Sequence, residues 1–181
     1  MKTKPLVLLS LLTAIALTIF IVEAQLPPLV SVPGIKMGLA NIITLFALRF
    51  FTRRQAAAIL FVRVVLGCLL GGQISALFYS LGGGFVCLAV ESFVIRRVPD
   101  KQLWAVSVLG AIAHNITQLL IAALLISSPT VFWYLPALLA AGIVTGAFTG
   151  LCVQAVVMKY HKQISRFIDQ KSKSTKKQGL P

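Results

Sequence analysis

The chain has 181 residues, of which 58% are hydrophobic and only 12% are charged. Soluble globular domains carry about 25% charged residues, so this composition excludes an ordinary soluble enzyme, a disordered tail and a disulfide-rich scaffold. Lysine and arginine number 17 against 4 acidic residues, which gives a formal net charge of +13. Most of these cations lie at the chain ends or between long apolar runs, a distribution typical of integral membrane proteins rather than of nucleic-acid-binding proteins.

Charged residues, prolines and glycines divide the chain into six apolar segments. In chain order, these run over residues 6–24, 37–51, 56–70, 74–95, 103–126 and 131–158. A membrane-spanning helix needs about 20 residues, a length that the second and third segments do not reach unaided. The pattern predicts an all-α, polytopic domain of six transmembrane helices over residues 1–158. A basic, partly disordered cytoplasmic tail is expected over residues 159–181.

The lysines and arginines between the segments predict the orientation in the cell membrane. With the N-terminus inside, every basic loop residue except Lys36 falls on the cytoplasmic side. Because cytoplasmic loops are enriched in Lys and Arg, both termini are expected in the cytoplasm. One alternative concerns the first segment: Lys2 and Lys4 before an apolar run, with Val22-Glu23-Ala24 after it, also resemble a cleaved signal peptide. We expect the segment to be retained, because the run is long for such a signal.

Arg63 lies midway along the third segment, where an ionisable side chain is expensive to insert. Such residues face a cavity or a partner, so Arg63 is a candidate anchor for an anionic substrate group. The alternatives are a structural pair with Glu23 or Glu91, or a side chain that reaches the membrane surface. Glu91 and Arg49, near the predicted cytoplasmic helix ends, are interpreted as anchors at that surface.

His114, Asn115 and Gln118 form a polar patch in the fifth segment. Residues 114 and 118 are four apart and share a helix face. The patch is interpreted as part of a substrate cradle, or alternatively as polar contacts between helices. A metal site is not expected, because the only other histidine lies in the tail.

Residues 25–36 form the longest predicted outer loop, stiffened by prolines that include Pro28 and Pro33, with Gly34 for a tight turn. The loop is interpreted as a lid over the pocket, or as an ordinary proline-rich connector. Lys36 would add a second positive charge at the mouth, and Glu23 is either a gate or partner for Lys36 or Arg63, or a solvated helix end.

Small residues recur every four positions in two segments, a spacing that lets helix backbones approach closely. Ser10, Ala14 and Thr18 in the first segment form a candidate docking surface for another helix, of this chain or of a partner. In the sixth segment, Gly142, Gly146 and Gly150 are expected to pack within the chain. Gly82-Gly83-Gly84 in the fourth predicts a kink or a close contact.

Catalysis by this chain alone is not expected. The sequence contains no GxxxxGK[ST] phosphate loop, and its four acidic residues are isolated from one another. Magnesium–diphosphate chemistry normally needs clustered carboxylates. No cofactor or metal is predicted.

Four motifs together resemble one family. They are Glu23, Pro33-Gly34-Ile35-Lys36-x-Gly38-Leu39-x-Asn41, Arg63-Val-x-Leu66-Gly67 and Gly110-Ala-x-x-His114-Asn115-x-x-Gln118-Leu119. This combination resembles the Gx transporter family, also named heptaprenyl diphosphate synthase component I. That family is similar to the substrate-binding S components of energy-coupling factor (ECF) transporters, which are small six-helix membrane proteins that dock on a transmembrane T component driven by two ATPases.

The resemblance implies a membrane substrate-binding subunit that takes up a small, anionic molecule with an ATPase-bearing partner. Its site would comprise the seven residues Glu23, Lys36, Asn41, Arg63, His114, Asn115 and Gln118. Ser10, Ala14 and Thr18 would form the docking stripe, although Thr18 departs from the usual second alanine. An alternative is a non-catalytic accessory component of heptaprenyl diphosphate synthesis, and a third hypothesis is a scaffold without a ligand.

Overall fold

The computed structural model describes residues 3–25, 38–72 and 75–177. It contains six α-helices: α1 (Thr3–Gln25), α2 (Asn41–Phe50), α3 (Arg53–Leu70), α4 (Ser75–Val94), α5 (Leu103–Ile126) and α6 (Leu135–Lys177). Two short 3₁₀ helices, η1 (Asp100–Gln102) and η2 (Pro129–Tyr134), precede α5 and α6. No strand occurs in the described ranges, which confirms the predicted all-α class.

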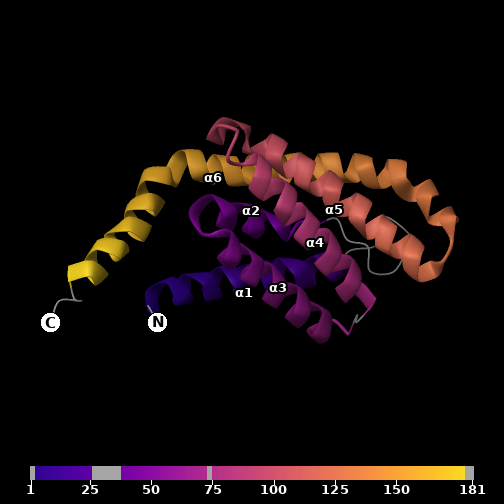
Figure 1. Cartoon of the computed structure of the whole chain (residues 1–181), viewed down its shortest axis with the longest axis horizontal. Coiled ribbons are helices and arrows are strands. Elements are labelled where there is room, and N and C mark those ends of the chain that lie inside the picture. The colour runs from indigo at the N-terminus through magenta and orange to yellow at the C-terminus, as the bar shows by residue number, and fades with distance from the viewer. Residues whose placement is uncertain (1–2, 26–37, 73–74, 178–181) are drawn as a thin grey trace.

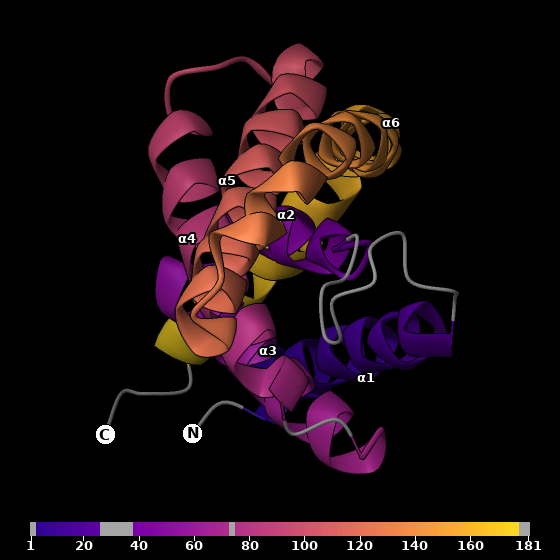
Figure 2. The same cartoon turned by 90° about the vertical axis from the view of Figure 1, so that its right-hand side faces the viewer.

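The helices form two packed groups (Figures 1 and 2). Helices α4, α5 and α6 lie side by side on one side of the molecule, and α1 packs on α3 on the other. The short helix α2 lies between the groups and contacts α1, α3, α4 and α6. The N-terminal residues of α2 therefore lie in the middle of the bundle.

Local sequence signals define the ends of α3. Thr52 caps its N-terminus, where the Thr52 hydroxyl accepts from the Gln55 N–H and the Gln55 side chain accepts from the Thr52 N–H. This reciprocal capping box satisfies backbone donors that have no partner within the helix. At the other end, Gly72 adopts φ +65°, a left-handed conformation that favours glycine after a helix.

The glycines of α6 bring it against the backbone of α5. A Cβ atom on Gly146 would lie 2.8 Å from Val108 Cα, and one on Gly150 would lie 2.5 Å from Trp104 Cα. Ser107 and Thr149 exchange a hydroxyl hydrogen bond of 2.9 Å across the same interface. The expected intramolecular packing of this stripe is confirmed.

The three consecutive glycines of α4 also make close contacts. Gly82 lies against Ile121 of α5 and Gly84 against Leu60 of α3, whereas Gly83 lies against His114 and Gln118. The triplet therefore admits side chains from two neighbouring helices, as the close-contact interpretation predicts.

The burial pattern differs from that of a soluble domain. Large apolar side chains are exposed on the helices, for example Val7 (67%), Leu124 (79%) and Phe148 (61%). The buried side chains form an apolar core that also contains polar and ionisable groups, including Glu23, Arg63 and His114. An apolar exterior with ionisable groups kept inside is the arrangement expected of a helix bundle in lipid.

Among the residues that the structure describes, four helices are long and apolar enough to cross a membrane, namely those within residues 6–25, 76–94, 100–126 and 130–160. Helix α2, with 10 residues, is about 15 Å long, half of the roughly 30 Å hydrocarbon core. Helix α3 has 18 residues but carries Arg53, Arg54 and Arg63. The six predicted helices are thus present, while six complete spans remain a prediction.

Helix α6 continues beyond the bundle. It extends through the basic segment as far as Lys177, and its C-terminal part projects away from the other helices (Figure 1). Most of residues 159–181, which the sequence predicts to be a partly disordered tail, are thus helical.

Candidate functional site

Arg63 lies in the centre of the bundle, with 3% of its surface exposed. Its Nη2 donates a hydrogen bond of 2.6 Å to Oδ1 of Asn41, the first residue of α2. Its Nε and Nη1 have no hydrogen-bond partner within the described parts of the chain. The guanidinium is therefore neither at the membrane surface nor fully satisfied, which excludes the interpretation that it reaches the surface.

Glu23, near the end of α1, is also buried, at 5% exposure. Its carboxylate accepts hydrogen bonds from the backbone N–H groups of Gly38 (2.5 Å) and Ala40 (3.4 Å). Gly38 adopts φ +81°, a conformation that favours glycine. Glu23 thus fixes the entry to α2, and the alternative of a solvated helix end is wrong, because the side chain is buried and bonded to the backbone that precedes α2.

Glu23, Asn41, Arg63 and His114 line one small interior cavity together with five further residues. The remaining lining residues are Phe20, Gly38, Ala40, Val64 and Ser80. The cavity has a volume of about 10 Å³, close to what a single water molecule occupies. Four of the seven expected binding residues therefore meet around one hollow, which a ligand larger than water would have to widen.

The polar patch of α5 divides between two interfaces. His114 and Gln118 both face α4: a Cβ on Gly83 would lie 2.9 Å from His114 Nδ1 and 3.0 Å from Gln118 Cγ. Asn115 faces α6 instead, where its Nδ2 donates a 2.7 Å hydrogen bond to the Leu138 carbonyl. All three side chains are buried, but of them only His114 lines the cavity.

Several polar atoms of this patch have no partner in the described residues. They are His114 Nδ1, Asn115 Oδ1 and both side-chain polar atoms of Gln118. Buried polar atoms are normally hydrogen-bonded, so these groups retain capacity for a ligand or for ordered water.

Cys87 and Glu91 of α4 extend the polar interior, although the sequence interpretation did not include them in the site. Cys87 Sγ accepts from Asn41 Nδ2 at 3.6 Å. Glu91 is 1% exposed, and its Oε2 has no partner in the described residues. The surface-anchor interpretation of Glu91 is therefore wrong, because Gly110 of α5 leaves room for the carboxylate: a Cβ there would lie 2.7 Å from Glu91 Oε1.

One signal in the sequence indicates that Cys87 and Glu91 belong to the polar interior. Residues 87 and 91 are four apart and so share a helix face. In the structure, α4 continues to Val94 beyond them.

Arg49 is the other expected surface anchor. It is about one-third exposed and pairs with Asp100.

Comparison with known proteins identifies the family. Residues 12–156 match the sequence model of the family described as heptaprenyl diphosphate synthase component I. The chain belongs to this family. The match extends from α1 into the membrane part of α6 and ends before the basic segment, so it includes every residue that lines the cavity. No curated protein and no solved structure matches the chain significantly.

The match confirms the family resemblance that the four sequence motifs indicate. Some of the implied site residues lie outside the described part of the chain: Pro28, Pro33, Gly34 and Lys36. The described segment resumes at Gly38, which itself lines the cavity.

The stripe implied for docking lies on the outer face of α1. Ser10, Ala14 and Thr18 are all exposed, while Ala16 and Phe20 of the same helix are buried. The Thr18 hydroxyl donates to the Ala14 carbonyl, so it satisfies its hydrogen bond within α1. This face is available to a partner helix or to lipid.

Proposed function

We propose that this member of the heptaprenyl diphosphate synthase component I family is a membrane subunit that binds a small anionic molecule around Arg63. The observation that carries the proposal is the buried guanidinium, of which two nitrogens lack a partner in the described residues. The chain is proposed to bind and deliver the ligand without transforming it.

The energetics of burial favour a ligand with negative charge. Leaving a buried donor unsatisfied costs about 1–3 kcal/mol, and more for a charged group. A carboxylate or phosphate accepts from two arginine nitrogens at once. Such a group at Arg63 would accept from Nη1 or from Nε while Nη2 keeps its hydrogen bond to Asn41.

The neighbouring groups suit the remainder of a polar ligand. His114 lines the cavity, and Gln118 lies on the same face of α5, where both side chains pack against Gly83. Cys87 and Asn41 continue the polar surface toward Glu91. Asn115, which bonds to Leu138, is proposed to hold α5 against α6 and to contribute its free carbonyl oxygen only if the helices separate.

The segment between α1 and α2 is the proposed route of entry. Glu23 holds Gly38 and Ala40 at the edge of the cavity through backbone hydrogen bonds. Movement of Gly38 and Ala40 away from Glu23 would enlarge the cavity, whose volume is now about 10 Å³. Residues 25–36 would then act as the lid, with Lys36 as a second cation at the mouth.

Active uptake would need a partner, because the sequence contains no phosphate-binding loop for nucleotide hydrolysis. A transmembrane T component with ATPases, as in ECF transporters, fits that requirement. The exposed face of α1 with Ser10, Ala14 and Thr18 is the proposed docking surface. We further propose six spans with both termini in the cytoplasm.

Ligand capture without ATP tests the proposal. The purified chain is reconstituted in liposomes and incubated with a small-molecule extract of the source cells, and retained compounds are identified by mass spectrometry. Arg63→Gln and His114→Ala are expected to abolish retention, whereas Arg63→Lys retains part of it. Arg97→Gln is the charge-matched control, because Arg97 is exposed and stacks on Phe93. Retention unaffected by Arg63→Gln would exclude this site.

A second candidate function is favoured by the family description itself, which names a component of heptaprenyl diphosphate synthase. The chain would then assist a separate catalytic component in prenyl diphosphate synthesis. Deleting the gene and supplying precursors to broken cells distinguishes the two functions. If the chain is a transporter, supplying precursors to broken cells restores long-chain prenyl diphosphate synthesis. If it is an accessory component of the synthase, synthesis stays low despite that supply.

A further inference from the structure

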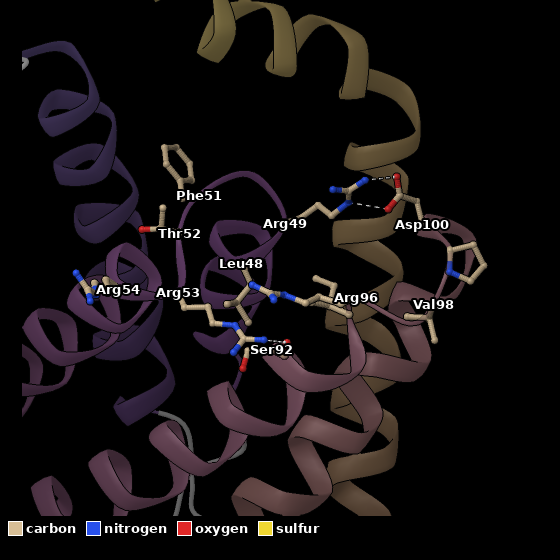
Figure 3. A pocket seen from close by; sticks show the side chains of 12 residues that line it. Leu48, Arg49, Phe51, Thr52, Arg53, Arg54, Ser92, Arg96, Val98 and Asp100 are labelled. Atoms are coloured by element: carbon tan, nitrogen blue, oxygen red, sulfur yellow. Dashed lines mark hydrogen bonds and ion pairs between the residues drawn. The ribbon is translucent and has the colours of Figure 1, made fainter. Parts of the chain in front are cut away.

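A second, much larger pocket lies where α2 meets α3 and α4 meets η1 (Figure 3). Its volume is about 1200 Å³, above the 300–1,000 Å³ typical of small-molecule sites. It is at the end of the bundle that the distribution of basic residues predicts to be cytoplasmic. None of its lining residues belongs to the Arg63 cavity.

The pocket has a strong excess of positive charge. Arg49, Arg53, Arg54 and Arg96 line it, together with a single acidic residue, Asp100. Arg49 and Asp100 neutralise each other through two hydrogen bonds of 2.6 and 2.9 Å. Three guanidinium groups therefore remain without a countercharge among the lining residues.

Two of these guanidinium groups converge. Figure 3 shows the side chains of Arg53 and Arg96 pointing into the pocket toward one another, whereas Arg54 points away. Arg53 donates to the Ser92 carbonyl at 2.7 Å, which holds it across the pocket from α3 to α4. Like charges that lie close together repel each other. An anion bound between the two guanidinium groups would be attracted to both and would offset that repulsion.

Helix α3 adds to the positive electrostatic potential of the pocket. Its N-terminus, capped by Thr52, opens onto the pocket, and a helix N-terminus carries partial positive charge. Arg97, the neighbour of Arg96, behaves differently: it binds the Phe93 carbonyl and stacks 3.7 Å above the Phe93 ring. The convergence is thus specific to the pocket rather than common to every basic residue at this end.

Part of the pocket wall is apolar. Leu48, Phe51, Ile95 and Val98 line it beside the arginines. A free inorganic anion gains nothing from such a wall, whereas a headgroup attached to a hydrocarbon chain uses both parts. At a helix-bundle end near the membrane surface, the ligand that fits is an amphiphile with a phosphate headgroup.

We propose that this pocket binds the phosphate or diphosphate headgroup of a membrane amphiphile between Arg53 and Arg96. A phospholipid with a terminal phosphate and a prenyl diphosphate share this chemistry. The site is separate from the Arg63 cavity, so either proposal can fail without the other.

Binding of two probes tests the pocket. The full chain in maltoside detergent is titrated with dioleoyl phosphatidic acid and, separately, with farnesyl diphosphate, and bound ligand is counted by native mass spectrometry. Arg96→Gln and Arg53→Gln are each expected to weaken binding about tenfold, as loss of a charge-assisted contact predicts. Arg97→Gln is the matched control and leaves the affinity unchanged.

The two probes distinguish the source of the headgroup. Preference for farnesyl diphosphate identifies a prenyl diphosphate, and preference for phosphatidic acid identifies a lipid. Arg96→Lys, which keeps the charge, should retain more affinity than Arg96→Gln, and helicity by circular dichroism verifies that each variant is folded. Absence of binding by both probes, or an equal loss in Arg97→Gln, would overturn the proposal.

Discussion

The Arg63 guanidinium and the Asn41 side chain join α3 to α2 through a 2.6 Å hydrogen bond in the bundle interior. Both side chains line the same interior cavity. Asn41 also donates to Cys87 Sγ, so it links three helices. Its removal should therefore affect stability as well as binding.

Asn41→Ala is expected to lower the free energy of unfolding by about 1.5–3 kcal/mol, the range for hydrogen bonds to charged groups. Thermal unfolding in detergent measures the effect. Gln102→Ala is the control, since Gln102 is exposed in η1. Equal stability of the two variants would show that Arg63 does not depend on Asn41.

Alanine substitutions at Gly150 and Gly82 should change the stability of the bundle by different amounts. A Cβ on Gly150 would meet the backbone of α5 at Trp104 Cα, whereas one on Gly82 would meet only the terminal Cδ1 of Ile121. Backbone cannot yield as a flexible side chain does, so Gly150→Ala should destabilise the bundle by about 1–3 kcal/mol. Gly82→Ala should be near neutral, because alanine also improves helix propensity. Comparable melting temperatures for the two variants would contradict the α5–α6 packing.

Asp100→Asn separates stability from anion binding. The Arg49–Asp100 pair is about one-third exposed, and such pairs contribute about 0–1 kcal/mol. Little change in melting temperature is expected. The same substitution removes the only carboxylate among the residues lining the arginine pocket, so affinity for phosphatidic acid or farnesyl diphosphate should rise. Weaker binding would count against electrostatic recognition there.

Cysteine reactivity reports on the interior next to the cavity. Cys87 is 2% exposed and Cys68 is equally buried, whereas Cys152 is partly exposed. An apolar maleimide should modify Cys152 first and reach Cys87 only after denaturation, as measured by mass spectrometry of peptides. Rapid modification of Cys87 in the folded protein would indicate a far more open bundle.

The sequence predicted the helices well because the charged and proline-rich boundaries coincide with their ends. The fifth segment was predicted at residues 103–126 and is observed there as Leu103–Ile126. Helix α2 begins later than predicted, since the predicted residues 37–51 shorten to Asn41–Phe50. Backbone hydrogen bonds from Gly38 and Ala40 to Glu23 replace the first helical turn.

The site was only partly predictable, because residue spacing fixes a helix face but not the helix opposite it. His114 and Gln118 face α4 together, as their spacing indicates, yet Asn115 faces α6. Glu91 was misplaced because its burial depends on Gly110, a glycine of another helix. The convergence of Arg53 and Arg96 depends likewise on how the start of α3 packs against the end of α4, and could not be derived from charge counts.

Native mass spectrometry of the protein extracted gently from its own membrane tests the Arg63 site most directly. We predict a co-purifying small anion on the wild-type chain and on Arg97→Gln, and its loss from Arg63→Gln at unchanged helicity. An anion that stays bound to Arg63→Gln, or a wild-type chain that emerges without any small molecule and captures none from cell extract, would contradict a ligand at the buried guanidinium.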